Sequence, residues 1–312
     1  MHFLREQCVF VALILTIVVF AILTPKFFTV DNITMVFRQR AIIGIIACSM
    51  TLVLVSAHFD LSVGAIVSFS AVTVIQLFNA LGPGPAIAVV LALGILIGLA
   101  NGFLIGYLRL DSMIVTLGMT GIVQASTYFV SGGQNSVLKN ADGSWFLWLG
   151  RSSFGVIPVI SIIWVGFMIL YHIILKRAAF GYRIRAIGGN RVASGFSGIK
   201  VKKNIMTAFV LNGFMAAFAG IALASRVGSA QNTIGEGYEL DAITAVVLGG
   251  TAINGGRGSV VKTFIGVLVL GVINSGLTML GLKYYVQWLA NGLVILVVVL
   301  IDVLAGRNQG GK

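Results

Sequence analysis

The sequence predicts an all-α, polytopic membrane protein with about ten transmembrane helices in an inverted five-plus-five repeat. Of 312 residues, 58% are hydrophobic and only 10% are charged, and the mean hydropathy is +1.03. A soluble domain carries about 25% charged residues, so a soluble enzyme is excluded. The apolar residues suffice for about nine to ten spans of about 20 residues each. The 39 glycines agree with this class, because small residues let membrane helices pack closely.

Ten apolar runs predict the helices in order. They cover residues 8–23, 41–57, 62–80, 85–107, 112–130, 155–175, 205–224, 241–254, 258–280 and 284–303. The run at 241–254 is short for a complete span. The first run is followed by Thr24-Pro25-Lys26, a poor cleavage site, so we expect a retained helix and not a signal peptide.

The positions of Lys and Arg predict that both termini are cytoplasmic. With that orientation fourteen basic residues lie inside and seven outside, and cytoplasmic loops carry the excess. Arg38 and Arg40 are counted in an outside loop. Most of the difference comes from residues 171–205, which contain eight basic residues and no acid. The net charge of +12 is therefore explained by topology and docking, and we predict no nucleic-acid partner.

A short repeat supports the inverted arrangement. Residues 98–104 and 271–277 share the pattern G-x-x-N-[GS]-x-L, with Asn101 and Asn274 in equivalent places. The two copies fall in the fourth and ninth runs, which have opposite orientations if each half holds five runs. Inverted repeats are a common design of transporters. Chance similarity between glycine-rich helices is the alternative.

Polar residues inside or beside apolar runs need a reason, because an ionisable group at membrane depth costs at least about 2.5–3.5 kcal/mol. Asp60 precedes the third run, which begins at Ser62, and Glu239 precedes the eighth, which begins at Asp241. Each pair either caps a helix or forms a broken-helix turn on a transport path. Asparagines within the runs either bond neighbouring helices or line a pore. The candidates for a path or a broken-helix turn are His58, Asp60, Ser62, Gly64, Asn101, Asn274, Glu239 and Asp241.

We predict no catalytic residue and no metal site. Residues 195–198 have the G-x-S-G form of an intramembrane serine protease, but Ser197 lies in the basic loop. Residues 255–263 fail the spacing of a phosphate loop, because Val261 precedes Lys262. No cofactor is therefore expected in this chain, and any ATP with its Mg²⁺ would bind to another polypeptide.

The basic loop, about residues 176–204, predicts a short helix outside the bilayer. Asn190 can cap a helix that starts at Arg191, and Gly198 can end it. Such a helix either contacts anionic lipid or docks a cytoplasmic partner.

Several motifs, in the order in which they occur along the chain, resemble those of ABC permeases of the ribose/xylose/galactose type. The loop pattern Phe180-Gly181-x-x-x-x-Ala186-Ile-Gly-Gly-Asn190 continues to Ser197-Gly-Ile199. The segments 60–64, 116–118, 237–251 and 255–260 belong to the same set. Together they cover nearly the whole chain and are highly specific for this family.

The resemblance implies a single transmembrane permease domain over residues 1–312, without enzymatic activity, in the bacterial inner membrane. Its partners would be a second permease chain (a homodimer favoured), an ATP-binding subunit, an extracytoplasmic sugar-binding protein and membrane lipid. It implies import of a monosaccharide, with a ribose-like pentose favoured. Coupling to the ATPase would fall to Gly188, Gly189, Asn190, Arg191, Ala193, Ser194, Phe196, Ser197, Gly198 and Ile199.

Other substrates remain open. The same family could serve nucleosides, a furanosyl signalling molecule or branched-chain amino acids, and an ion-driven secondary transporter is a rival of a different class. The sequence also departs from the family at Ala57-His58-Phe59, where relatives usually show Gly-Gly-Ile. If this turn approaches the path, His58 would alter the shared substrate preference.

Overall fold

The computed structural model describes residues 2–25, 27–139, 141 and 143–307, without the side chains of 2–8, 284, 298–299 and 301–307. Helices make up most of this part of the chain. They are α1 His2–Leu23, α2 Val30–Val55, α3 Val63–Leu81, α4 Pro83–Gly106, α5 Ser112–Ser131, α6 Trp145–Arg151, α7 Val159–Arg177, α8 Ala179–Gly189, α9 Arg191–Phe196, α10 Val201–Val227, α11 Tyr238–Leu248, α12 Val260–Met279 and α13 Tyr284–Arg307.

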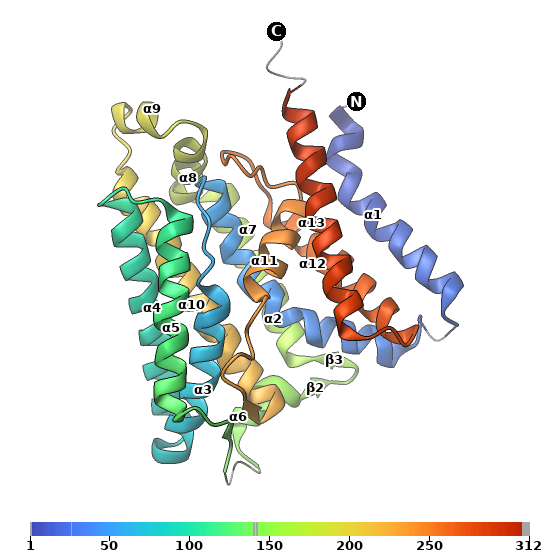
Figure 1. Cartoon of the computed structure of the whole chain (residues 1–312). Coiled ribbons are helices and arrows are strands. Elements are labelled where there is room, and N and C mark those ends of the chain that lie inside the picture. Colours follow the sequence, from blue (N-terminus) through green and yellow to red (C-terminus); the bar gives the residue numbers. More distant parts are fainter. Residues whose placement is uncertain (1, 26, 140, 142, 308–312) are drawn as a thin grey trace.

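Two very short antiparallel strand pairs, absent from the sequence prediction, close one end of the bundle. Strand β1 (Ser136–Val137) pairs with β4 (Ser229–Ala230), and β2 (Ser153–Phe154) pairs with β3 (Ile157–Pro158). Both pairs lie near α6, at the end opposite α8 and α9 (Figure 1). Both chain termini lie toward the α8–α9 end.

Each of the ten predicted runs overlaps a helix, and among the described residues α2, α3, α4, α5, α7, α10 and α12 are long and apolar enough to cross a membrane. Two boundaries were wrong. Helix α2 starts at Val30, well before the predicted run at 41–57, so Arg38 and Arg40 are helical instead of lying in a loop. Helix α11 ends at Leu248, before the predicted end at residue 254.

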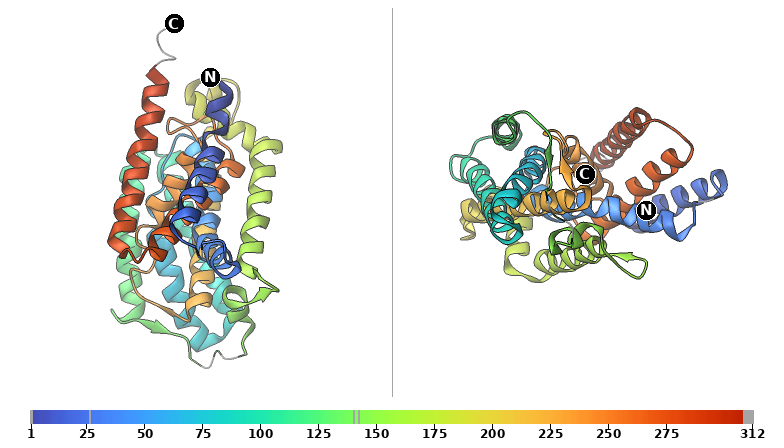
Figure 2. Two further views of the ribbon diagram at one scale, coloured as in Figure 1. Left: turned by 90° about the vertical axis from the view of Figure 1, so that its right-hand side faces the viewer. Right: turned by 90° about the horizontal axis from the view of Figure 1, so that it is seen from below.

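The core of the bundle is formed by α2, α3 and α10, which are the most buried of the long helices. Helix α4 packs along α10, while α12 packs on α2 and carries α1 on its outer side. Helices α1 and α13 stand at the edge of the bundle when it is seen along its axis (Figure 2). The bundle therefore places two packed pairs, α4 with α10 and α12 with α2, on either side of its centre.

Two of the helices begin inside the bundle. After α2 ends at Val55, the chain turns at residues 56–57, and residues 58–62 run back toward the middle as non-helical chain, where α3 starts (Figure 1). Helix α11 is likewise preceded by a non-helical segment, residues 231–237, that rises from β4. Buried extended backbone must find hydrogen-bond partners, and side chains of α5 supply them: Ser112 accepts from Phe59 N, and Thr116 accepts from Leu61 N.

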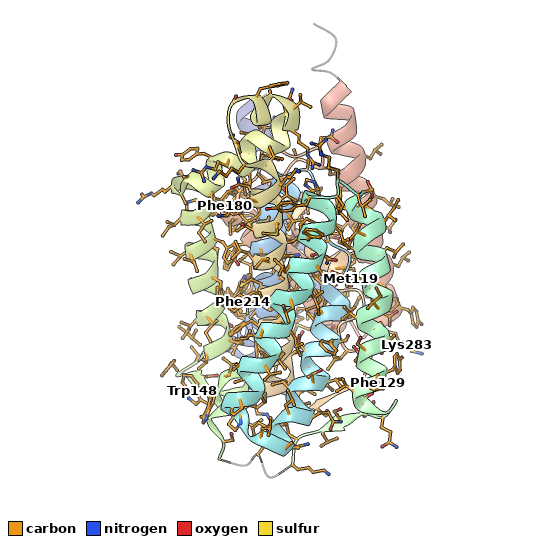
Figure 3. All side chains as sticks on the ribbon, turned by 90° about the vertical axis from the view of Figure 1, so that its left-hand side faces the viewer. Met119, Phe129, Trp148, Phe180, Phe214 and Lys283 are labelled. Atoms are coloured by element: carbon orange, nitrogen blue, oxygen red, sulfur yellow. The ribbon has the colours of Figure 1, made fainter. Side chains whose placement is uncertain are left out.

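Exposed aromatic side chains lie toward both ends of the bundle, with Tyr182 on α8 and Phe196 on α9 at one of them. Phe129 is 88% exposed and Trp148 is 48% exposed, and both lie at the end away from α8, whereas Phe180 lies at the α8 end (Figure 3). Aromatic residues are enriched where a membrane protein meets the membrane–water interface. The outer surface between these ends is apolar on α5, where Leu117 and Ile122 are exposed, as expected of a helix that faces lipid.

Candidate functional site

Asp60 is the centre of a fully buried polar network at the start of α3. One oxygen, Oδ1, accepts from Ser62 N at 3.0 Å and from Ser62 Oγ at 2.6 Å, and Oδ2 accepts from Asn212 Nδ2 at 2.9 Å. Asn101 donates to Ser62 Oγ, and Ser49 donates to Asn212 Oδ1. The network therefore joins α2, α4 and α10 to the extended segment before α3.

This geometry corrects the capping hypothesis for Asp60 and Ser62. Ser62 is the N-cap residue of α3, but its side chain caps no backbone N–H of the helix. The carboxylate bonds to Ser62 itself and then across to α10. The alternative role, a broken-helix turn on a transport path, remains a prediction. Asn101, Asn212 and Asn291 each donate a hydrogen bond to another element, which is one of the two roles predicted for asparagines within the runs.

The two helix starts meet at Gly64. A Cβ atom at this position would overlap the side chain of Glu239 and, at 2.6 Å, the carbonyl oxygen of Gly235. Gly235 N in turn bonds to Ser68 Oγ at 2.9 Å. Only glycine permits this approach, so the segment before α11 is held directly against the first turn of α3.

An open cavity of about 770 Å³ lies beside the start of α11. This volume falls within the range of about 300–1,000 Å³ that is usual for small-molecule sites. The lining residues come from α2, α10, α11 with its preceding segment, α12 and α13: Met35, Arg38, Gln39, Arg40, Ile43, Arg226, Glu236, Gly237, Tyr238, Glu239, Leu240, Asp241, Asn274, Gln287, Trp288, Asn291, Gly292 and Ile295. They bring together three predicted path residues, Asn274, Glu239 and Asp241.

Arg40 and Asp241 form an ion pair in this cavity. Arg40 Nη1 lies 3.6 Å from Asp241 Oδ2, and Asn291 Nδ2 donates to Asp241 Oδ1 at 3.0 Å. The pair connects α2, α11 and α13. Our sequence analysis missed Arg40, because we assigned it to a loop. The signal that could have found it is the acidic residue at the start of the eighth run, which needs a cation if it is buried.

The remaining predicted path residues do not line the cavity. Asp60, Ser62 and Asn101 belong to the buried network, and Gly64 lies between the network and Glu239. His58 is nearly buried beside Ser56, with its ring edge-on to Phe209. The structure therefore divides the predicted set into a cavity group and a network group that meet at Gly64.

Helices α8 and α9 form a separate unit at one end of the bundle (Figure 1). The predicted cap is confirmed: Asn190 Oδ1 accepts from Ala193 N at 2.9 Å, and α9 runs from Arg191 to Phe196. Gly198 follows in the left-handed conformation, with φ of +80°. On α9 the side chains of Val192 and Phe196 are 69% and 90% exposed.

Helix α8 was not predicted, although Ile184 and Ile187 are buried at helical spacing. Its end packs closely on α2, since a Cβ atom at Gly188 would overlap the carbonyl oxygen of Val55. The residues predicted for coupling, 188–199, thus form the end of α8, all of α9 and the turn after it. Partial burial, and then repulsion from Arg109, lowers the pKa of the Arg191 guanidinium.

Comparison with known proteins identifies the family. The family model described as "Branched-chain amino acid transport system / permease component" matches residues 32–303. The chain belongs to this permease family. It is 40% identical to the ribose import permease protein RbsC of Bacillus subtilis, over 94% of this chain and 91% of that protein. It is 34% identical to the fructose import permease protein FrcC of Rhizobium meliloti, over 96% and 87% of the two chains.

The galactose/methyl galactoside import permease protein MglC of Escherichia coli is 34% identical over 97% of this chain and 95% of its own length. No solved structure matches the chain significantly. Members of this family are transport components of ABC importers and not enzymes. The permease therefore depends on an ATPase and on a binding protein as partners.

Proposed function

We propose that this permease is the transmembrane subunit of an ATP-driven importer of a monosaccharide, with a ribose-like pentose as the favoured substrate. The observation that carries the proposal is the 40% identity to a ribose import permease over 94% of the chain. Ribose import permeases of two other bacteria are 38% and 37% identical over almost the whole chain. An extracytoplasmic binding protein would deliver the sugar.

Helix α9 is the proposed contact with the ATP-binding subunit, which would hold the ATP and its Mg²⁺. Its exposed Val192 and Phe196 offer an apolar surface outside the bundle. Arg191 and Arg109 repel one another, so an acidic group on the partner would relieve that repulsion. Differential contact of α9 with two states of the ATPase would couple hydrolysis to opening of the path.

The α8–α9 end is the proposed cytoplasmic face of the bacterial inner membrane. The basic residues of the segment 171–205 gather there, and cytoplasmic loops carry the excess of Lys and Arg. Both chain termini lie toward the same end and would be cytoplasmic. The cavity beside α11 draws its lining from the parts of α2 and α10 nearest the other end, where the binding protein would dock.

We also propose that the chain is an inverted repeat and that two copies pair. Helix α4 of the first half packs on α10, and α12 of the second half packs on α2. An acid before α3 bonds to α10 through Asn212, and an acid in α11 bonds to α2 through Arg40. These reciprocal contacts are what a two-fold related pair of halves requires. A second copy of the chain would complete the permease as a homodimer.

A branched-chain amino acid is the second candidate substrate, because the matching family model carries that description. An ion-driven mechanism has less support. Asp60 is an acid in the interior, as such a mechanism needs, but both of its oxygens accept hydrogen bonds from Ser62 and Asn212. A carboxylate that exchanged ions would need a free ligand position.

Reconstituted uptake tests the proposal. The permease, its ATPase and its binding protein are placed in proteoliposomes with ATP inside or outside, and uptake of radiolabelled D-ribose, D-fructose, D-galactose and L-leucine is compared. We expect ATP-dependent uptake of a sugar that requires the binding protein. Uptake driven by an ion gradient without ATP, or uptake of L-leucine alone, would contradict the proposal.

A further inference from the structure

Two buried amide oxygens in the cavity lack partners. Asn274 is 8% exposed and Asn291 is 9% exposed, and the Oδ1 atom of each has no hydrogen-bond partner within the part of the chain that the structure describes. Both residues line the cavity, on α12 and α13 respectively. A buried acceptor without a partner costs about 1–3 kcal/mol, so two such residues in the lining of one cavity favour a ligand with hydrogen-bond donors.

The charged side chains of the lining balance one another. It contains three basic residues, Arg38, Arg40 and Arg226, and three acidic residues, Glu236, Glu239 and Asp241, and Arg40 pairs with Asp241. A ligand with a net charge of either sign would therefore meet repelling as well as attracting groups. A hydroxyl group can bond to the neutral amide oxygens and can also share the Arg40–Asp241 pair, since guanidinium and carboxylate groups each have several bonding positions.

The rest of the lining suits a ring with both apolar and polar faces. Trp288 presents an indole ring to the cavity, and Ile43 and Ile295 add apolar surface from α2 and α13. Aromatic rings provide a large apolar face with a polar edge. The volume of about 770 Å³ accommodates a small ligand together with water.

We propose that this cavity is a binding site for a neutral, hydroxyl-rich ligand, a monosaccharide, within a single permease chain. Asn274 and Asn291 accept hydrogen bonds from its hydroxyl groups, and the Arg40–Asp241 pair lies beside it. The permease then contributes to substrate selection after the binding protein has released the sugar. This inference rests on the proposed function, because it assumes that a sugar crosses the chain.

The first experiment measures uptake kinetics of the complete importer with Asn274→Leu, which keeps the size of the side chain and removes its acceptor. The matched control is Asn232→Leu. Asn232 is also buried with an unpartnered Oδ1, but it lies outside the cavity lining. We expect Asn274→Leu to raise the KM for sugar uptake about two- to tenfold, the equivalent of one hydrogen bond, with ATPase stimulation by the binding protein unchanged. Asn232→Leu should leave KM unchanged.

The second experiment needs no variant. Binding of radiolabelled D-ribose, D-fructose and D-galactose to the wild-type chain in lipid nanodiscs is measured at millimolar concentration, with L-leucine as competitor. We expect one sugar to bind and L-leucine not to displace it. If the wild-type importer takes up sugar but the chain binds none, or if Asn274→Leu leaves KM unchanged, the cavity site is wrong while the proposed function stands. If the wild-type importer takes up no sugar, the proposed function fails.

Discussion

The Asp60–Asn212 hydrogen bond can be tested by exchanging the two residues. In Asp60→Asn the oxygen that bonds to Ser62 is kept, but the new amide directs N–H groups at Asn212 Nδ2, which loses its acceptor. Asn212 regains an acceptor only by flipping its amide, and Ser49, which donates to Asn212 Oδ1 at 2.7 Å, must then direct its O–H to the carbonyl oxygen of Ile46 alone. A buried donor without an acceptor costs about 1–3 kcal/mol.

Asn212→Asp alone is expected to lower the stability more than Asp60→Asn does, but to restore stability when the two substitutions are combined. Asn212→Asp places a second carboxylate within hydrogen-bond distance of Asp60, and like charges in a buried site repel strongly. In the double variant the carboxylate introduced at position 212 would accept from both the amide introduced at position 60 and Ser49, so every donor regains an acceptor. Residues that share one network show such non-additive energies.

The assay is thermal unfolding of the purified chain in detergent, together with uptake by the reconstituted importer. For a chain of this size 1 kcal/mol corresponds to about 2–4 °C, so Asp60→Asn should lower the midpoint by about 2–12 °C. The double variant should recover most of this loss. Ser126→Ala is the control, since Ser126 is exposed and bonds only within its own helix. A double variant that is no more stable than Asp60→Asn would refute the reasoning.

Three further predictions concern single positions. Asn190→Ala should weaken α9 by about 1 kcal/mol, because the cap to its backbone is lost, and this corresponds to about a fivefold change in helix population. The variant should therefore reduce ATP hydrolysis stimulated by the binding protein. Asn190→Asp keeps a capping oxygen and should retain that hydrolysis. Gly64→Ala should lower the free energy of unfolding by about 1–3 kcal/mol, because the added methyl group overlaps Glu239. Gly118 has open space around it, so Gly118→Ala should raise the free energy of unfolding by up to about 1 kcal/mol. Thermal unfolding of both variants measures the difference. Ala57→Gly should raise the free energy of unfolding by about 1–2 kcal/mol, since Ala57 has φ of +63°; an unchanged melting midpoint would mean that this turn carries no strain.

The features that the sequence predicted well are local. Each of the ten apolar runs overlaps a helix, and seven helices of the described part of the chain are long and apolar enough to cross a membrane. The Asn190 cap was predictable because the side chain bonds to the backbone three residues later, and the left-handed Gly198 was predictable for the same local reason. Such interactions depend on a few neighbouring residues and need no knowledge of the fold.

The features that it missed depend on distant partners. Asp60 and Asn212 are 152 residues apart in the chain, so the choice between a cap and a cross-helix bond could not be made locally. Arg40 is helical and nearly buried only because Asp241 lies opposite and α12 packs against its side chain. The count of basic residues between the apolar runs placed Arg40 in an outside loop, whereas the structure places it in α2 beside Asp241.

Helix α2, like α10, touches both the proposed docking unit and the proposed sugar site. At one end the carbonyl oxygen of Val55 accepts from Gly256 N at 2.8 Å and lies against Gly188 at the end of α8. In the other half of the helix Arg40 lines the cavity and pairs with Asp241. Close-packed interiors transmit strain, so a displacement of α8 and α9 would reach α2 together with α7 and α10, on which α8 also packs. The extended segment that leaves α2 is anchored by Asp60, and through it the start of α3 must follow. A shift of α2 would therefore act on the Arg40–Asp241 pair and on the buried network together, which is the arrangement that a path with two alternating openings requires.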